Sequence, residues 1–181
     1  MPNWCNNRLT ISHKDIDVLD NLMAQIRADD STFFGHIKPM PENTFRGNLG
    51  EEERKMCEEK GIPNWYDWSY HNWGTKWDAC HVDWSHGDDG IVTFVFDTAW
   101  SPPIPVYKEL MKQGFDVEAY YVEYGCGFAG EWHCSVEDEQ YLDSRFNIYE
   151  EPVSHELDEV FDITATLAEW AEEEEEEKEY A

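Results

Sequence analysis

Two histidines and one aspartate form the segment of the sequence that comes nearest to a metal-ligand set. His81 and Asp83 stand two positions apart, so their side chains would share one face of a strand, and His86 follows nearby. Imidazole and carboxylate groups are ordinary ligands of transition metals, but a metal centre needs three or more converging ligands. The spacing brings no further ligand to these residues. We therefore interpret them as the polar face of a sheet and predict no metal ion and no cofactor.

The five cysteines show the pattern of neither a zinc site nor a disulfide framework. Seven residues separate Cys126 from Cys134, and no C-x-x-C pair is present. His133 and Cys134 are neighbours, so on a strand their side chains point apart and cannot form a thiol–imidazole pair. An odd number of thiols is typical of a reducing compartment. We predict a cytoplasmic protein without signal peptide or membrane-spanning segment, and we assign no catalytic residue.

Three glycines, Gly125, Gly127 and Gly130, have the spacing of a dinucleotide-binding loop. Such a loop leads from a strand into a helix, whose N-terminal N–H groups hold the pyrophosphate. Here the segment follows the last predicted strand and continues as Glu131 to Cys134 without a helical pattern. We therefore interpret these glycines as a simple loop.

Aromatic residues are concentrated between Asn64 and Trp84, a stretch that holds five of the nine tryptophans. Such density requires burial, because each indole hides a large apolar area and carries one N–H that needs an acceptor. Asn64 is predicted to cap a short helix that runs from about Trp65 to Trp73 and ends at Gly74.

The tryptophans around this helix are predicted to meet in space. We expect Trp73, Trp77 and Trp100 to form one packed cluster with the aromatic character of a cleft. Lys76 is expected to stack as a cation on an indole or to pair with Asp78. The members of the predicted aromatic cleft are Trp73, Lys76, Trp77, Asp78, Trp100 and Tyr124.

Alternation of apolar and polar residues predicts four strands, at residues 3–12, 79–85, 91–98 and 115–124. Helical spacing predicts a first helix near residues 16–26 and another that follows a Ser101 cap, while Phe33 to Ile37 is expected to be extended. This order indicates the α+β class. We predict a ferredoxin-like βαββαβ antiparallel sheet with helices on one face, a long helical insertion after the first helix and an acidic C-terminal helical extension.

Charge divides the chain unevenly. It carries 40 acids against 13 bases, a net charge of −27, which argues against direct binding of nucleic acid or anionic membranes. Residues 137–181 hold 18 acids and 2 bases, net −16, and residues 1–136 hold the other 22 and 11, net −11. The predicted domains are a ferredoxin-like domain at 1–135 with its insertion at about 28–75, an acidic docked helical extension at 136–170, and a disordered glutamate-rich tail at 171–181.

Four motifs occur in the first 135 residues. They are P-N-W-C-x-N-x-L (Pro2 to Leu9), N-W-G-T-K-W-D (Asn72 to Asp78), F-x-T-A-W-S-P-P (Phe96 to Pro103) and Y-x-x-E-Y-G-x-x-F-x-G (Tyr120 to Gly130). In this order they resemble the YubB-type ferredoxin-like domain family, which is encoded by bacteriophages and conjugative plasmids and has no assigned activity. Tyr124 departs from the resemblance, since many relatives carry proline there. The resemblance implies a ferredoxin-like fold and a mobile-element origin, and it supplies no catalytic residue.

These observations lead to a first hypothesis about function. The chain would be a phage- or plasmid-encoded acidic interaction protein in the host cytoplasm, a DNA-mimic inhibitor of restriction, CRISPR or a similar defence. Its partner would be a basic host protein that binds nucleic acid or serves in defence, and the other explanation of the acidity is solubility. The predicted partner-binding acids are Asp83, Asp116, Glu118, Asp158, Glu159 and Asp162.

The alternative hypothesis is an enzyme, or a nucleotide- or RNA-binding domain, that uses the aromatic cleft. Ferredoxin-like sheets can stack bases on exposed aromatic residues, and Trp4, Arg8 and Tyr120 are predicted on such a face. The same face is predicted to carry Asp83 and Asp116, whose charges would repel phosphates.

Overall fold

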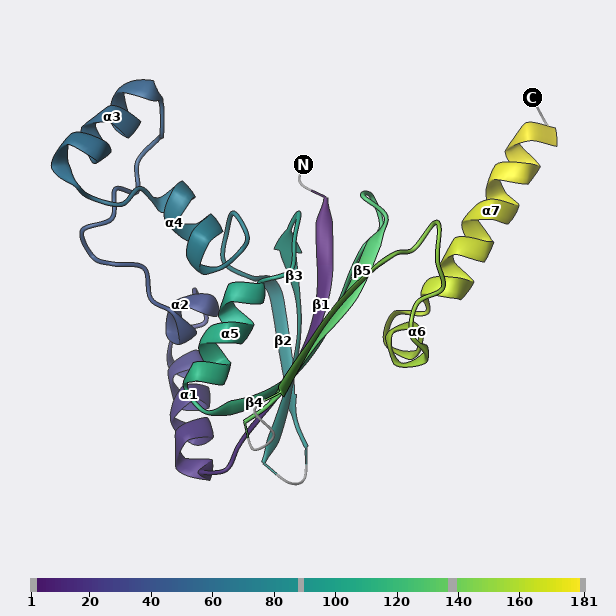
Figure 1. The fold of residues 1–181 in the computed structure, drawn as a ribbon, viewed down its shortest axis with the longest axis horizontal. Coiled ribbons are helices and arrows are strands. Elements are labelled where there is room, and N and C mark those ends of the chain that lie inside the picture. Colours follow the sequence, from purple (N-terminus) through teal and green to yellow (C-terminus); the bar gives the residue numbers. More distant parts are fainter. Residues whose placement is uncertain (1–2, 88–89, 137–139, 180–181) are drawn as a thin grey trace.

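The first strand of the chain lies in the middle of the sheet, and the fold extends outward from it. The computed structural model describes residues 3–87, 90–136 and 140–179, in which six antiparallel strands follow the order β2-β3-β1-β4-β5-β6. Figure 1 shows this sheet between two groups of helices. The strands are β1 (Trp4–His13), β2 (Cys80–His86), β3 (Ile91–Ala99), β4 (Phe115–Glu123), β5 (Phe128–Ser135) and β6 (Gln140–Asn147). The helices are α1 (Ile16–Ala28), α2 (Phe34–Ile37), α3 (Glu51–Lys60), α4 (Trp65–Asn72), α5 (Ile104–Lys112), α6 (His155–Phe161) and α7 (Ile163–Glu179).

The predicted ferredoxin-like fold is confirmed. All four predicted strands form, each within two residues of its expected ends, and they pair in the order expected for a βαββαβ unit. Pro2 of the first motif, residues 137–139 of the predicted extension and Tyr180–Ala181 of the predicted tail lie outside the described residues.

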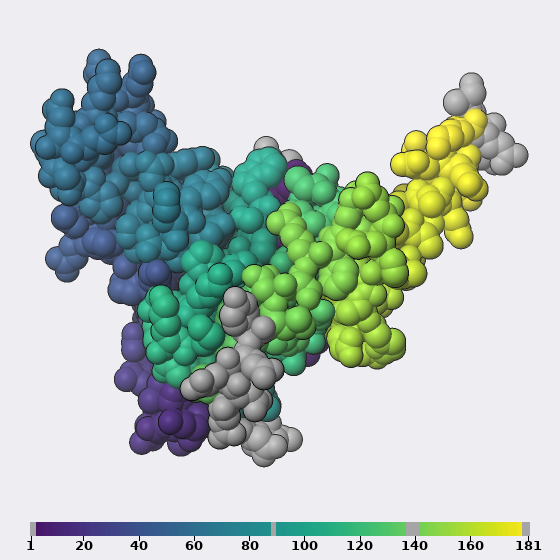
Figure 2. Space-filling view, viewed as in Figure 1, coloured from purple at the N-terminus to yellow at the C-terminus, as the bar shows by residue number. Residues whose placement is uncertain are grey.

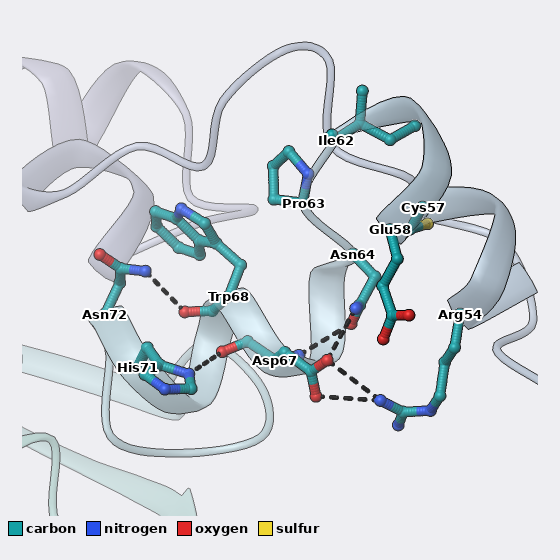
Figure 3. A pocket seen from close by; sticks show the side chains of 11 residues that line it. Arg54, Cys57, Glu58, Ile62, Pro63, Asn64, Asp67, Trp68, His71 and Asn72 are labelled. Carbon is teal, nitrogen blue, oxygen red and sulfur yellow. Dashed lines mark hydrogen bonds and ion pairs between the residues drawn. The ribbon is translucent and has the colours of Figure 1, made fainter.

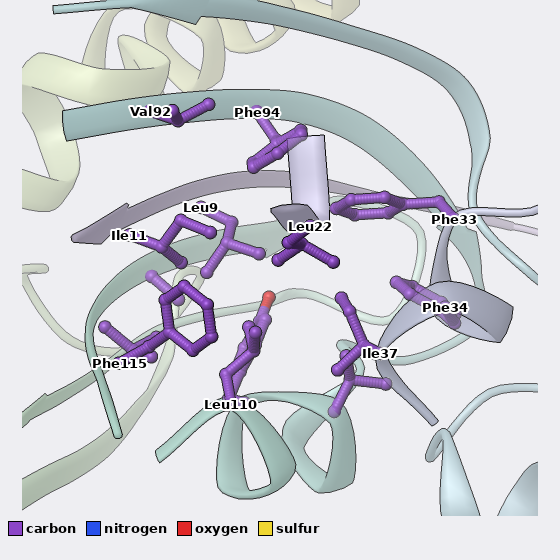
Figure 4. Packing of buried hydrophobic residues seen from close by; sticks show 14 of the residues in the cluster. Leu9, Ile11, Leu22, Phe33, Phe34, Ile37, Val92, Phe94, Leu110 and Phe115 are labelled. Carbon is purple, nitrogen blue, oxygen red and sulfur yellow. The ribbon is translucent and has the colours of Figure 1, made fainter. Parts of the chain in front are cut away.

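β1 has one buried face and one more polar face, as its alternating sequence predicts. Leu9 lies opposite Phe94 of β3 and Ala119 of β4, and directly opposed residues in antiparallel strands point to the same side. On that side the sheet meets α1, α2 and α5, and Figure 4 shows Leu22 of α1 and Leu110 of α5 directed into this core. The apolar face of β1 therefore forms one continuous core surface with the same faces of its two neighbours, β3 and β4.

A buried amide stands in the middle of this face. Asn7 has no exposed surface, and its Nδ2 donates to the carbonyl oxygen of Cys5 at 2.8 Å and to Oγ1 of Thr98 at 2.9 Å. Its Oδ1 accepts from the hydroxyl of Tyr107 at 3.4 Å. Because buried polar groups destabilise a fold unless they are bonded, this network fixes β1 against β3 and α5.

Helix ends follow local signals in most cases. Asn64 caps α4 by accepting from the N–H of Asp67 at 2.9 Å, as predicted, and Gly61 ends α3 at a φ of +62°. The prediction that Ser101 caps a helix was wrong. Its hydroxyl donates to the carbonyl oxygen of Gly74 at 2.7 Å, and α5 begins only at Ile104.

The helices α6 and α7 cover part of the opposite face of the sheet. Tyr120 and Val122 of β4 and Ala129 of β5 point away from the main core and pack against Leu157 of α6 and Ile163 of α7. Figure 1 shows α6 and α7 on the side of the sheet opposite α1 and α5. The C-terminal extension therefore builds a second core.

The structure also corrects the predicted extension and tail. β5 and β6 add two strands to the sheet, and β6 lies inside the segment predicted as an acidic docked helical extension. β5 lacks clear alternation because both of its faces are covered, so its pattern gave no strand signal. The glutamates that were predicted to be disordered continue α7 through Glu179.

Figure 2 shows two parts that project from the body of the molecule. One is the lobe of α3 and α4, which belongs to the predicted insertion, and the other is the end of α7. Residues 171–178 of α7 are all exposed.

Docking of α6 can be tested through Tyr120. Burial beneath the extension, with smaller contributions from Glu118, Glu131 and Glu156, raises the pKa of Tyr120 to about 12. The substitution Leu157→Asp places a charge in the second core, so α6 should undock and Tyr120 should ionise near the ordinary tyrosine pKa of about 10. The measurement is the difference in absorbance at alkaline pH between this variant and its Tyr120→Phe counterpart, with circular dichroism as the folding control. If Tyr120 of the Leu157→Asp variant still ionised at the same pH as in the unchanged protein, the docking of α6 over Tyr120 would be contradicted.

Candidate functional site

Asp78, predicted as a member of the aromatic cleft, caps a helix instead. Its carboxylate accepts from the N–H groups of Phe33 at 3.2 Å, Phe34 at 2.7 Å and Ala79 at 2.8 Å, and from the hydroxyl of Thr32. Hydrogen bonds to a carboxylate at a helix N-terminus are among the stronger kinds. The residues predicted to be extended form α2 because their cap comes from a distant part of the chain.

The predicted aromatic cleft does not form. Trp73 lies in the main core, where its indole N–H donates to the carbonyl oxygen of Lys38 at 3.0 Å. Tyr124 lies on the other side of the sheet, where its ring meets Trp170 of α7 at a centroid distance of 5.2 Å. The intervening sheet separates these two residues.

Trp77 and Trp100 are partly exposed rather than packed in a cluster. Their exposed fractions are 39% and 43%. The ammonium group of Lys76 lies 4.6 Å from the centre of the Trp77 ring, which confirms the predicted cation–π contact. Asp78 is occupied by backbone N–H groups, as described above, so the alternative pairing with Lys76 is not observed.

The segment around Trp100 holds an unusual backbone conformation. Trp100 has a φ of +72°, which is rare for a bulky side chain. Two hydrogen bonds tie its segment to the neighbouring loop: Thr75 Oγ1 donates to the carbonyl oxygen of Ala99 at 2.9 Å, and Ser101 bonds Gly74 as described above. A Cβ atom at Gly74 would lie 2.6 Å from the ring of Pro105, so this close approach requires glycine.

The predicted acids of the sheet lie on one face but do not gather in one place. Asp83 is on the edge strand β2, where its carboxylate accepts from the N–H of Trp84 at 2.8 Å. Asp116 and Glu118 are on β4, and Asp116 accepts from the N–H of Val136 at 2.7 Å. Glu118 is exposed and has no such backbone partner in the described residues.

The predicted acids of the extension lie at the junction of α6 and α7. Asp158 accepts from the N–H of Thr164 at 2.7 Å, so it holds the two helices together and is not a free surface charge. Glu159 is exposed beside His155, and Asp162 ends α6 at a φ of +51°. Of these three acids, Glu159 and Asp162 face solvent.

The histidines considered as metal ligands have separate partners. His81 Nδ1 lies 2.9 Å from the carboxylate of Asp97, while His86 Nε2 lies 2.6 Å from the guanidinium of Arg27. Asp83 is turned to its own neighbour in β2. In the ranges that the structure describes, no three His, Cys, Asp or Glu side chains are grouped so as to hold a metal ion.

The thiols and the glycine segment have structural surroundings. Burial raises the pKa of Cys134, and a hydrogen bond with Glu123 raises the pKa of Cys126, so neither thiol is activated as a thiolate. Glu123 is itself buried and accepts from the N–H groups of Gly125 at 2.8 Å and Cys126 at 2.7 Å. Gly125 and Gly127 lie in a turn that leads into β5, as predicted, whereas Gly130 lies within β5 and not in a loop.

A hollow of about 420 Å³ lies between α3 and α4, and it was not predicted from the sequence, although Asn64 on its wall was expected as a helix cap. Figure 3 shows Asp67 at its centre, where Arg54 Nη1 donates at 3.0 and 3.1 Å and Asn64 Nδ2 donates at 2.7 Å. These hydrogen bonds, first that of Asn64 and then that of Arg54, lower the pKa of Asp67. Since Arg54 of α3 pairs with Asp67 of α4, this hollow serves as a joint between two helices. Arg54 and Asp67 are thirteen positions apart, beyond the reach of any helical spacing rule.

Comparison with known proteins defines the family. The family model described as the ferredoxin-like domain in Api92-like protein matches residues 76–180, more than half of the chain. The chain belongs to this Api92-like family. A crystal structure of the protein api92 from Yersinia pseudotuberculosis superposes with a TM-score of 0.51 at 11% sequence identity, over 80% of this chain and 98% of that one. At such identity the likeness shows the fold alone.

Two further findings bear on the family member described here. No curated protein matches its sequence. Among the described helices, none is long and apolar enough to cross a membrane.

The roles of Asp78 and Trp77 can be separated by substitution. Asp78→Ala removes a charged acceptor from several N–H groups, so the free energy of unfolding should fall by about 2–4 kcal/mol. Trp77→Ala should lower it by about 1 kcal/mol or less, because the side chain is substantially exposed. Chemical denaturation of both variants measures the difference. If Trp77→Ala lowered the free energy of unfolding more than Asp78→Ala does, Trp77 would belong to a packed cluster, as the sequence predicted.

Proposed function

We propose that this Api92-like protein is a non-enzymatic acidic interaction protein that binds a basic surface on a nucleic-acid-binding or defence protein of the host. In this proposal it acts as a DNA mimic, and its gene is carried by a phage or a conjugative plasmid, the origin implied by the resemblance to YubB-type proteins. The observation that carries the proposal is the helix α7, which presents six consecutive exposed glutamates, Glu172 to Glu177.

The spacing of charge along α7 is close to that of duplex DNA. An α-helix rises about 1.5 Å per residue, so consecutive glutamates carry about one negative charge per 1.5 Å of axis. Duplex DNA carries about one per 1.7 Å of axis. A protein surface that binds phosphates through lysine and arginine would therefore meet a similar line of charge on α7.

The anchoring of α7 supports a role for these charges at a defined place. Ile163 is 1% exposed, and Trp170 meets Tyr124, so the first turns of α7 are held on the domain. Like charges four residues apart destabilise an isolated helix, and Lys178 offsets this only at Glu174, at 3.5 Å. A cationic partner would remove the repulsion, so its binding and the helical state of α7 should support each other.

The motif residues support a binding role rather than a catalytic one. The carboxylates of Asp78 and Glu123, two acids of the four motifs, accept hydrogen bonds from backbone N–H groups and hold loops in place. The alternative function, an enzyme or a nucleotide- or RNA-binding domain, depended on a cleft whose residues lie on different sides of the sheet. Only Trp77 and Trp100 remain available from that set as an exposed aromatic surface.

The proposal predicts that capture of a partner depends on α7 and competes with DNA. Glu173, Glu175 and Glu177 changed together to Lys should abolish capture of a DNA-binding protein from host lysate, because they reverse the line of charge. The matched control changes the exposed Glu51, Glu52 and Glu59 of α3 to Lys, which alters the net charge equally. Capture should also fall with added duplex DNA, and at about 0.5 M salt, where the Debye length is roughly 4 Å.

A partner that is retained by the α7 variant, in excess DNA and at high salt, would show that the acidity serves solubility alone. Equal losses from the α3 and α7 variants would show that only net charge matters.

A further inference from the structure

We infer that the outer edge of β2, with the hollow beside it, is a docking site for an extended basic segment of the partner protein, which adds to the sheet as a further strand. That the partner is basic is taken from the proposed function. The site itself follows from the edge, the hollow and the charges around them.

β2 presents unpaired backbone groups outward, since it is the terminal strand of the sheet. The N–H of Gly87 donates to the carbonyl oxygen of Ile91 at 2.8 Å, which fixes the phase of the ladder with β3. Bonded pairs alternate along an antiparallel ladder, so Ser85 and Asp83 also bond to β3 and the N–H and C=O of Trp84 point away from it. An extended segment could therefore pair with the outer edge of β2.

A hollow of about 440 Å³ adjoins this edge on the helix side of the sheet. Its apolar wall is formed by Ile26, Phe33, Val82 and Trp84, and Asp30 stands on its rim. Val82 and Trp84 are residues of β2 that pack partly against the main core. Because alternate side chains of a paired strand share one face, the apolar side chains of a docked segment would enter this hollow.

The backbone at the mouth of the hollow is strained. His81 lines the hollow with a φ of +52°, and the ladder between β2 and β3 is interrupted between Cys80 and Asp83. Two hydrogen bonds hold this conformation: Asp97 accepts from His81 Nδ1 at 2.9 Å and from Asn6 Nδ2 at 2.7 Å. Bulges and positive φ values in non-glycine residues concentrate beside functional sites, where they direct a side chain.

Charge selects the partner. Asp83 points to the face of the sheet opposite the hollow, where it would meet a lysine or arginine side chain of the docked segment. Arg27, the nearby cation, is already placed 5.0 Å over the Trp84 ring and is bonded to His86. A second copy of the chain is a poor occupant, since two molecules of net charge −27 repel each other.

Asp83 gives the edge two states. In the free protein its carboxylate accepts from the outward N–H of Trp84, which leaves that donor satisfied and protects the edge from unwanted pairing. When a segment docks, its carbonyl oxygen takes over this N–H, and Asp83 is released to pair with a lysine or arginine. Basic segments would thus be favoured over neutral ones.

The test uses acetylated eight-residue peptides of alternating lysine and valine as probes. One isomer carries N-methyl groups only on its valines and the other only on its lysines, so each blocks one edge of the extended peptide while charge and side chains stay the same. The isomer blocked on the edge that faces β2 should bind about tenfold more weakly, from the loss of two or three hydrogen bonds. Equal affinities of the two isomers, measured by fluorescence anisotropy, would overturn the inference.

Variants of the full chain locate the site. Asp83→Lys should weaken the better-binding isomer by about tenfold and abolish the difference between isomers, whereas the charge-matched Glu59→Lys on α3 should preserve that difference. The α7 triple variant separates this inference from the proposed function. If the two peptide isomers still differ in affinity but duplex DNA does not compete with capture of the partner, mimicry alone is refuted. If the isomers bind equally while capture still depends on α7, the edge site alone is refuted.

Discussion

The pairing of β1 with both β3 and β4 is the constraint on which the rest of the structure depends. In the sheet order, β2 and β3 lie on one side of β1, and β4, β5 and β6 lie on the other, so no other strand joins the two halves. The family match begins at residue 76 and therefore omits this strand. The matched region is accordingly not a complete sheet by itself, and the buried bonds of Asn7 show how closely β1 is fitted between its neighbours.

The two faces that β1 creates have different roles. One is closed by α1, α2 and α5 over the main core, and the other is closed only in part, by α6 and α7 over β4 and β5. The acids of the sheet lie on the less covered face, and the glutamates of α7 extend from its margin. Strong negative charge also opposes pairing between copies of the edge strand β2, so in our proposal the charge that attracts a partner also limits self-association.

The sequence was informative wherever structure depends on near neighbours. The alternation in β1 and β3 predicted both strands, and Asn64 with Asp67 predicted the start of α4, because these patterns act over a few residues. Asp78 escaped this reasoning, since its partners at Phe33 and Phe34 lie 45 and 44 positions earlier. Likewise, nothing local distinguishes the buried Trp73 from the exposed Trp77, because the turn between them decides which indole meets the core. The hollow beside β2 was also missed, since it is assembled from α1, the segment that precedes α2, and β2.

The central place of β1 has a consequence for the order in which the protein folds during synthesis. Translation proceeds at about 5–20 residues per second, so β1 waits for roughly 4–17 seconds before all of β3 has been made. In that interval α1, the next element along the chain, is the available cover for Leu9 and Ile11. The inserted helices α2 to α4 prolong this delay yet add little to the entropy of closing the loop, which rises by only about 0.6 kcal/mol for each doubling of loop length. The insertion therefore lengthens the exposure of an unpaired apolar strand to the ribosome and chaperones far more than it weakens the finished fold.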